Sequence, residues 1–379
     1  MIKWGISAYN HNAAISVIED DKIIFASESE RYSGIKNDKN IPENMIKDVL
    51  MYGEPDQIHW YENNLLKNAR RIYAGQKYKK LEIHPWLKRK RIRYHGHHET
   101  HARAGFHTSP FDEATVLVVD AIGEFETTTI WHGQGNKLDK IWRQYYPKSL
   151  GLFYSAITHR VGLKPNEEEY ILMGMAAYGD PYKYYKAMFP LLEENLHRGC
   201  RWWMPDAHGQ QDTYDMAASA QLIYEEEFEM LLRKARLWNT SKNLVIMGGC
   251  ALNCVANNLA LKYFDNVWIM PAPGDAGSAI GAALDKKVEW TGPYLGYDIQ
   301  GDYPINKTIQ ELKKNKIVGV ANGRAEFGPR ALGNRSLFAD PRGIQVKDQV
   351  NEIKRRQKFR PFSPVIMEEH AQYYFNMPI

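Results

Sequence analysis

Two short series of strand-like segments set the pattern of the chain. Near the start, runs rich in Ile, Val and Phe, separated by Asn or Asp turns, predict strands over residues 2–9, 13–19 and 22–29. A second series predicts strands over residues 115–120, 127–132 and 137–146. In both series a polar loop follows the first strand, Asn10-His11-Asn12 in one copy and residues 120–124 in the other. This weak internal repeat predicts two related halves.

Between and after these series, helical periodicity alternates with short buried strands. Helices are predicted over 150–177, 215–239, 251–264 and 276–286, and strands over 244–247 and 267–270. Glycine turns close the two strands, at Gly248, Gly249, Gly274 and Gly277. Such turns suit a close approach of phosphate to backbone amides. With the repeat, this order predicts an α/β, actin-like or sugar-kinase-like duplicated fold with an active cleft between its halves.

A Gly/Pro/Tyr-rich link over residues 293–304 marks a change of pattern. After it come a helix, a strand over 317–322 and a basic region. We place the domain boundary in this link and expect one domain over 1–295 and a second over 296–379.

The composition restricts the class of protein. Of the 379 residues, 44% are hydrophobic and 25% are charged, which is typical of a globular chain with real cores. The three cysteines are too few and uneven for a disulfide framework, which favours a reducing compartment. The first residues lead directly into a strand pattern, and no apolar run approaches the roughly 20 residues needed to cross a bilayer. We therefore expect a cytoplasmic protein with no membrane partner.

The densest chemical signal is the run His95-Gly-His97-His98-Glu-Thr-His101. His97 and His101 stand four residues apart, so on a helix both imidazoles face the same way. Two such imidazoles suit Fe, Zn, Cu or Ni, and carboxylates would complete the ligand set. Asp120, at the end of a buried strand, and Asp275, on a glycine turn, are the candidate acids. The alternative is a polar, His-rich surface helix, and we expect His95 and His98 to face solvent or to lie behind the ligands.

Several blocks of residues resemble those of one enzyme family. They are His97-His98-Glu-Thr-His101-Ala, Asp120-Ala-Ile-Gly123-Glu124, Leu172-Met-Gly-Met-Ala-Ala-Tyr178-Gly179, Gly248-Gly249-Cys-Ala-Leu-Asn253-Cys254, Pro271-Ala-Pro-Gly274-Asp275-Ala-Gly277, Gly323-Arg324-Ala-Glu326-Phe-Gly-Pro-Arg330-Ala-Leu-Gly-Asn-Arg335-Ser336, Asp340-Pro-Arg342 and Phe359-Arg360-Pro-Phe362. On these blocks the chain resembles the O-carbamoyltransferase family that includes the nodulation-factor and tobramycin carbamoyltransferases. The run 323–336 is the most specific of them.

The resemblance implies a reaction and its cofactors. The N-terminal domain would be an actin-like transferase with iron (Fe2+), or another divalent metal, at His97, His101, Asp120 and Asp275. The C-terminal part would begin a YrdC-like domain, reduced or truncated at Ile379, where carbamoyl phosphate and ATP with Mg2+ form carbamoyl adenylate. The carbamoyl group would then pass to an acceptor hydroxyl at the metal site.

The resemblance also assigns residues to the two substrates. The cofactor-binding set would be Gly248, Gly249, Asn253, Gly274, Gly277, Arg324, Glu326, Arg330, Arg335, Arg356 and Arg360. Guanidinium groups suit phosphates, although a solvated basic face is the alternative for this region. His11 is the candidate base for the acceptor proton, and Arg31 and Lys36 are expected to face the cleft. The chain departs from the family pattern at Asn12, Gly34 and Ile171, so we expect its contacts to the acceptor to differ from the family's.

The acceptor is the least determined part of this interpretation. Residues 67–93 form a strongly basic block interleaved with Tyr73, Tyr78 and Trp86, as a nucleic-acid surface requires. Phage-type members of the family carbamoylate 5-hydroxymethylcytosine in DNA, so our first hypothesis is a hydroxymethylated pyrimidine in DNA. The alternatives are a small-molecule acceptor (a sugar, an antibiotic or a nodulation factor), a tRNA threonylcarbamoyl transferase, and a non-catalytic DNA-binding protein. The oligomeric state, including a homodimer, stays open.

Overall fold

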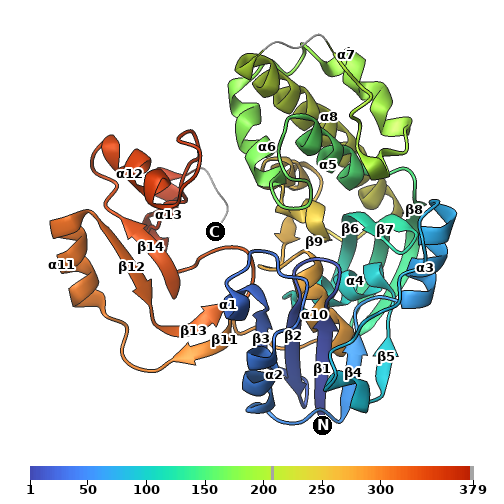
Figure 1. The fold of residues 1–379 in the computed structure, drawn as a ribbon, viewed down its shortest axis with the longest axis vertical. Coiled ribbons are helices and arrows are strands. Elements are labelled where there is room, and N and C mark those ends of the chain that lie inside the picture. The colour runs from blue at the N-terminus through green and yellow to red at the C-terminus, as the bar shows by residue number, and fades with distance from the viewer. Residues whose placement is uncertain (206–208, 376–379) are drawn as a thin grey trace. The chain divides into compact units, whose positions relative to one another are not determined.

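The computed structural model describes residues 1–205 and 209–375 (Figure 1). It divides into two compact units. The first contains Met1–Tyr303 and Val320–Ser336, and the second contains Pro304–Gly319 and Leu337–Ile379. The boundary expected between residues 295 and 296 stays a prediction.

The first half of unit 1 is built on a five-stranded sheet with the order β3-β2-β1-β4-β5. Strand β1 pairs antiparallel with β2 and parallel with β4, β2 pairs antiparallel with β3, and β4 pairs parallel with β5. The strands are β1 (Ile2–Ser7), β2 (Ala14–Glu19), β3 (Lys22–Glu28), β4 (Gln57–Trp60) and β5 (Ile92–Tyr94). Trp4, Phe25 and Trp60, on β1, β3 and β4, are fully buried.

The second half repeats this arrangement. Its sheet has the order β10-β9-β6-β7-β8, with β6 antiparallel to β7 and parallel to β9. The outer pairs, β7 with β8 and β9 with β10, are antiparallel and parallel respectively. The strands are β6 (Glu113–Gly123), β7 (Glu126–Gln134), β8 (Lys137–Tyr145), β9 (Asn243–Met247) and β10 (Asn266–Trp268). Because order and direction match strand for strand, the predicted duplicated, actin-like α/β fold is confirmed.

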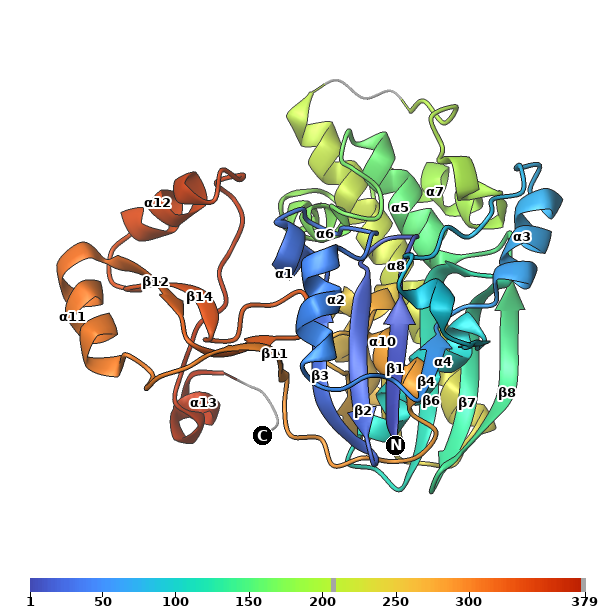
Figure 2. The ribbon, with the colours of Figure 1, turned by 60° about the horizontal axis from the view of Figure 1, so that its bottom comes forward.

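Two helices join the halves. Helix α4 (His97–Thr108) packs on β6, β7 and β9, and α10 (Asp275–Ala283) packs on β1, β2 and β4 (Figure 2). The two helices meet at Gly281, where a Cβ atom would lie 1.8 Å from the carbonyl oxygen of Thr100. Only a residue without a Cβ permits this backbone-to-backbone contact. The contact places the first residue of α10 beside the first turn of α4.

The remaining helices of unit 1 lie in its connections. They are α1 (Glu30–Ser33), α2 (Glu43–Leu50), α3 (Asn64–Tyr73), η1 (Leu87–Arg89), α5 (Leu150–Arg160), α6 (Glu169–Met175), η2 (Ala176–Tyr178), α7 (Tyr185–Met188), η3 (Phe189–Glu193), η4 (Leu196–Arg198), α8 (Gln210–Trp238), η5 (Gly249–Leu252), α9 (Cys254–Asn257) and η6 (Asn258–Lys262). The single helix predicted over 150–177 is divided, because Gly162 takes a φ of 87° after α5 and Pro165 follows. The helix predicted over 251–264 is likewise broken into short turns.

The C-terminal region forms smaller elements. Strand β11 (Tyr294–Ile299) pairs antiparallel with β13 (Gly323–Glu326) in unit 1. The other elements are α11 (Ile305–Asn315), β12 (Ile317–Ala321), β14 (Arg335–Ala339), α12 (Gln345–Ile353) and α13 (Glu368–Tyr374). Within unit 2 the carboxylate of Asp340 binds Lys316 at 2.9 Å and Arg342 at 2.9 Å. A YrdC-like domain stays a prediction for this part. Across the described ranges, no helix is both long and apolar enough to span a membrane.

Candidate metal centre

Four side chains from three elements of unit 1 converge on one point. His97 and His101 come from the first turn and a half of α4, Asp120 from β6, and Asp275 from the start of α10. Their ligand atoms all lie within 4.8 Å of one another, and all four side chains are buried. Nε2 of His97 lies 2.9 Å from Oδ2 of Asp120, 3.2 Å from Nε2 of His101 and 3.5 Å from Oδ1 of Asp275. Nε2 of His101 lies 3.5 Å from the same Asp275 oxygen.

Local sequence explains why these groups meet. The apolar run of β6 ends in Asp120, so the carboxylate emerges where the strand leaves the sheet core. Its Oδ1 accepts a hydrogen bond of 3.2 Å from the backbone N–H of Gly249, which follows β9. Gly248 takes a φ of 92°, and a Cβ there would lie 2.2 Å from the carbonyl oxygen of Val119. The glycine pair thus lets the end of β9 close against β6 and hold Asp120 in place.

The donor set fits a divalent ion. Ligands about 2.1 Å from one ion lie roughly 3–3.5 Å from each other, close to the separations found here. Burial lowers the pKa of His97, but the carboxylates of Asp275 and Asp120 outweigh it and raise that pKa to about 9. Burial opposes ionisation of Asp120, yet His101 and His97 hold its pKa well below the usual range. Buried carboxylates so poised attract positive charge, which a proton on His97 or a metal ion can supply.

The outer contacts of the ligands are sparse. Oδ2 of Asp275 and Nδ1 of both His97 and His101 are buried and form no hydrogen bond with any described residue. The ion-pair partner of this Asp275 oxygen among the described residues is Nε2 of His11, at 3.4 Å. His11 is 38% exposed in its side chain, so it lies between the buried ligands and solvent. Among the three predicted catalytic residues, His11 is therefore the one that contacts a ligand of the centre.

The other two residues expected in the cleft have different partners. The guanidinium of Arg31 donates a hydrogen bond of 3.1 Å to the carbonyl oxygen of Gly328 and lies 3.6 Å from the Glu28 carboxylate. Nζ of Lys36 donates to the Tyr170 hydroxyl at 3.2 Å and sits 4.7 Å from the centre of its ring. Their catalytic roles stay predictions.

Comparison with known families bears on what this centre does. The carbamoyltransferase N-terminus matches residues 56–202 and 204–284, and the carbamoyltransferase C-terminus matches residues 309–378. The chain belongs to the carbamoyltransferase family. It is therefore an enzyme, and a non-catalytic DNA-binding protein is excluded. The centre lies in the carbamoyltransferase N-terminal part.

Three relatives show the extent of the similarity. The uncharacterised protein sll1178 of Synechocystis is 33% identical over 98% of this chain and 77% of its own length. Nodulation protein NolNO of Sinorhizobium fredii is 28% identical over 98% of this chain, which spans 65% of NolNO. The 3'-hydroxymethylcephem-O-carbamoyltransferase of Amycolatopsis lactamdurans is 27% identical over 97% of this chain and 79% of its own length.

Among solved structures, component A of (R)-2-hydroxyglutaryl-CoA dehydratase from Acidaminococcus fermentans has 13% identity and a TM-score of 0.42. It covers 76% of this chain and 97% of its own. Since this similarity is low, the fold of this carbamoyltransferase is assigned from its own strand order.

Among the predicted phosphate-binding residues of the carbamoyltransferase, Gly277 has a structural reason to be glycine. A Cβ on Gly277 would lie 1.9 Å from the carbonyl oxygen of Ala272, and Gly274 is the N-cap of α10. Asn253 caps α9 by accepting from the N–H of Ala256 at 3.2 Å, and it exchanges hydrogen bonds with Gln221. These contacts leave phosphate binding at the turns a prediction.

The arginines of the block 323–336 are mostly occupied by backbone carbonyls. Arg324 donates to three carbonyl oxygens, those of Ile24 at 2.7 Å, Leu295 at 2.6 Å and Gly296 at 3.2 Å. Arg335 donates to four, those of Asn322, Asn334, Tyr297 and Gly323. Both side chains thus link backbone segments of unit 1 to one another, and their contacts to ATP stay predictions.

Glu326 organises the loop that carries Arg330. Its Oε1 accepts hydrogen bonds from the backbone N–H groups of Leu332 at 2.8 Å, Asn334 at 2.8 Å and Arg335 at 3.1 Å. Burial opposes ionisation, but these bonds lower the pKa of Glu326. Arg330 itself is exposed.

The last two predicted cofactor residues lie in unit 2. Arg356 donates to Oδ1 of Asn351 at 2.6 Å and stacks over the Phe362 ring at 4.2 Å. The backbone N–H of Arg360 donates to the carbonyl of Gln357 at 3.2 Å. Their contacts to ATP also stay predictions.

The sequence pattern did not single out Tyr61 and Glu62. Both are buried at the end of β4, and the Tyr61 ring centre lies 5.3 Å from that of His97. The Tyr61 hydroxyl forms no hydrogen bond with a described residue, and burial followed by the Glu62 carboxylate raises its pKa well above the usual value. Their position directly after a buried strand could have marked Tyr61 and Glu62 as candidate site residues, as the same position did for Asp120.

The two other histidines of the run differ from expectation in part. His98 is 1% exposed, and its Nδ1 lies 3.0 Å from the Thr129 hydroxyl, so it faces the core rather than solvent. Nε2 of His95 lies 2.9 Å from Nδ1 of His59. His98 is buried because α4 packs on β7, the strand that carries Thr129.

Proposed function

We propose that this carbamoyltransferase moves a carbamoyl group from carbamoyl phosphate, through carbamoyl adenylate made with ATP and Mg2+, to the hydroxyl of a small molecule. The observation that carries the proposal is the buried convergence of His97, His101, Asp120 and Asp275 within the family match. The Amycolatopsis relative, named for O-carbamoyl transfer to a hydroxymethyl cephem, supports the same acceptor class.

The residues around the centre suggest how the transfer proceeds. A divalent ion held by the four side chains, Fe2+ in our proposal, would polarise the carbamoyl oxygen. His11, 3.4 Å from Oδ2 of Asp275, is placed to take the proton from the acceptor hydroxyl, and Asp275 would stabilise the imidazolium. The hydroxyl oxygen bonds to the carbamoyl carbon while the bond from that carbon to the phosphate oxygen breaks. The buried Tyr61 ring limits the access of water beside His97.

The nucleotide half of the reaction is the less supported part. We propose that residues 296–379 contribute to adenylate formation, consistent with the match of the carbamoyltransferase C-terminus to 309–378. Exposed Arg330, on the loop organised by Glu326, is the first arginine to test against ATP. Arg324 and Arg335 are weaker candidates, because their donors already bind carbonyl oxygens.

A small-molecule acceptor replaces DNA as the favoured hypothesis. The relatives described above support the small-molecule alternative, and part of the basic block is neutralised within the fold. Nζ of Lys67 binds the Glu62 carboxylate at 2.5 Å, Arg70 is 6% exposed and donates to the carbonyl of Glu124, and Lys90 binds Glu54 at 3.1 Å. Fewer free cations weaken the case for a polyanionic partner.

Product mass spectrometry tests the proposal. The full chain is incubated with carbamoyl phosphate, ATP and a panel of hydroxyl acceptors that includes hydroxymethylated DNA and tRNA. We expect a gain of one carbamoyl unit on a small molecule, and its loss in Asp120→Asn but not in Asp139→Asn, an exposed acid on β8. A product on DNA or tRNA alone, or equal activity in the two variants, would contradict it.

A further inference from the structure

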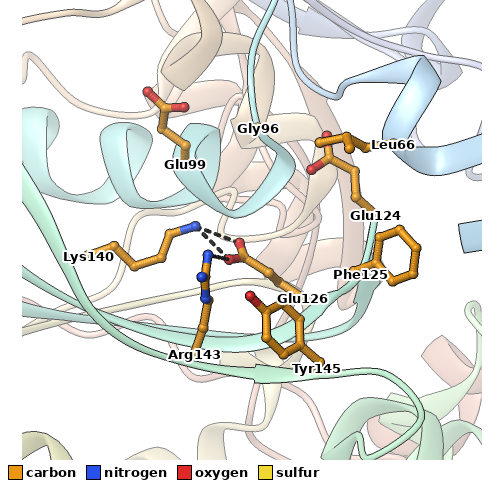
Figure 3. Close-up of a pocket in the computed structure, with 9 residues that line it drawn as sticks. All are labelled: Leu66, Gly96, Glu99, Glu124, Phe125, Glu126, Lys140, Arg143 and Tyr145. Atoms are coloured by element: carbon orange, nitrogen blue, oxygen red, sulfur yellow. Dashed lines mark hydrogen bonds and ion pairs between the residues drawn. The ribbon is translucent and has the colours of Figure 1, made fainter. Parts of the chain in front are cut away.

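Unit 1 contains a pocket of about 550 Å³ (Figure 3). Its volume is that of an ordinary small-molecule site. It is lined by Leu66, Gly96, Glu99, Glu124, Phe125, Glu126, Lys140, Arg143 and Tyr145. None of these residues belongs to the metal centre or to the predicted nucleotide set.

The pocket shares its supporting elements with the metal centre. Gly96 is the N-cap of α4, directly before His97, and Glu99 lies in the first turn of that helix. Glu124 follows β6, the strand that carries Asp120. Between them Gly123 packs so closely on His97 that a Cβ would lie 2.3 Å from its ring. A molecule in the pocket therefore lies next to the wall that holds His97.

One side of the pocket offers a buried hydrogen-bond acceptor. Glu124 is 9% exposed and takes a φ of 58°, which is unusual for a residue with a side chain. Its Oε1 accepts from the N–H of Asn63 at 2.5 Å, and its backbone carbonyl accepts from Arg70 at 3.2 Å. No described residue donates to Oε2, and burial raises the pKa of this carboxyl. The carboxyl is held in place by Asn63, and its free Oε2 suits an O–H or N–H donor of a ligand other than the reacting hydroxyl.

The opposite side carries an excess of positive charge. The Glu126 carboxylate binds Nζ of Lys140 at 2.6 and 2.8 Å, while Nη1 of Arg143 is 3.8 Å away (Figure 3). Two cations thus share one carboxylate. The Arg143 side chain is 55% exposed and its guanidinium lies 5.1 Å from the centre of the Tyr145 ring. Its remaining N–H groups suit an anionic group with two acceptor oxygens.

Apolar surface completes the pocket. Leu66 is 47% exposed and Tyr145 is 46% exposed, and Phe125 lies on the same side of the view as Glu124 (Figure 3). These groups suit a flat apolar body. A nucleic-acid backbone fits poorly, because it would bring several negative charges against Glu99 and Glu124.

We propose that this pocket binds the acceptor, and that it selects a small hydroxyl-bearing molecule with a flat apolar body and one carboxylate, which Arg143 binds. The inference rests on the proposed function, because it assumes that the acceptor is a small molecule. It adds where that molecule binds and which charge it carries. Arg143 becomes the residue that determines specificity for charge.

Direct binding tests the pocket without any transfer chemistry. The probe is para-hydroxymethylbenzoate, and the matched neutral ligand is para-hydroxymethylbenzamide. Titration calorimetry with the full chain, in the absence of ATP and carbamoyl phosphate, should show the benzoate binding about tenfold or more tighter than the amide. Arg143→Gln should remove this preference, whereas Lys137→Gln, an exposed cation at the other end of β8, should keep it. No benzoate binding at millimolar concentration, or a preference that survives Arg143→Gln, would overturn the proposal.

A parallel transfer assay separates failure of the pocket from failure of the enzyme reaction. With carbamoyl phosphate and ATP, the benzoate should be carbamoylated with a lower KM than the amide, and Arg143→Gln should raise that KM with little change in kcat. Equal KM values with undiminished transfer would refute the pocket and leave the transferase standing. Charge-selective binding with no carbamoyl product from any acceptor would refute the proposed function and leave the pocket standing.

Discussion

Helices α10 and α4 touch backbone to backbone at Gly281, and the variant Gly281→Ala measures what that contact contributes. A Cβ there would lie 1.8 Å from the carbonyl oxygen of Thr100 and 2.7 Å from the amide nitrogen of Ala104. Non-bonded carbon and oxygen atoms need roughly 3 Å or more, so the helices must separate by more than about 1 Å. Overpacking of this kind costs about 1–3 kcal/mol, and the better helix propensity of alanine offsets up to about 1 kcal/mol. We expect the free energy of unfolding to fall by about 1–2 kcal/mol.

The same displacement should weaken metal binding. Asp275 begins α10, whereas His97 and His101 lie on α4, so moving one helix separates the ligands. Ligand distances in metal sites vary by only about 0.2 Å, so a shift near 1 Å should lower affinity for Zn2+ or Fe2+ about tenfold or more. Equilibrium dialysis with metal analysis measures the affinity, and denaturant unfolding measures the stability.

Gly105→Ala provides the matched control on α4 itself. Its Cβ would also meet close neighbours, at 2.4 Å, but these are side-chain atoms of Met247 and Val245, which can move. The free energy of unfolding of Gly105→Ala should therefore be closer to that of the wild type, and its affinity for metal should be unchanged. If Gly281→Ala matches the wild type in both measurements, the helix contact does not position Asp275 and the argument is refuted.

Three further predictions concern stability. Burial raises the pKa of Glu28 from 4.5 to about 7, so between these pH values the folded state binds more protons than the unfolded state. The stabilisation by the protonated carboxyl is therefore complete below about pH 4.5, and roughly 3 kcal/mol of it is lost as the pH rises through 7. Chemical denaturation at several pH values should show this slope in the wild type and no such slope in Glu28→Gln. Nζ of Lys287 donates to the carbonyl oxygens of Phe106 and Ser109, at 3.0 and 3.1 Å, at the C-terminal end of α4. Lys287→Met removes both bonds and should lower the free energy of unfolding by about 1–3 kcal/mol. An unchanged urea midpoint would contradict this prediction. Arg335→Lys replaces the guanidinium that binds four carbonyl oxygens, so it should lower the free energy of unfolding by about 1–3 kcal/mol and leave the KM for ATP unchanged. A higher KM for ATP at normal stability would instead assign Arg335 to the nucleotide.

The local pattern of the sequence was sufficient for part of this molecule. Short runs rich in Ile, Val and Phe between polar turns predicted the three strands of each repeat, because strand preference and turn residues act over a few neighbouring positions. The spacing of His97 and His101 placed two imidazoles on one helix face for the same kind of reason. The types of residue that could bind a metal were therefore readable from the chain, and so was the family that the matches to its N- and C-terminal parts confirm.

Only the tertiary structure decided which of these residues meet and which are otherwise engaged. Asp275 reaches His97 because α10 crosses α4 at Gly281, a contact between residues far apart in the sequence. Arg324 and Arg335 carry the same charge as Arg330, yet their donors bind carbonyl oxygens while Arg330 is exposed, and His98 is buried. The pocket with Arg143 likewise exists only where β7, β8 and the start of α4 come together. Periodicity is a local property of the chain, whereas the partner of a charged side chain depends on which elements pack around it.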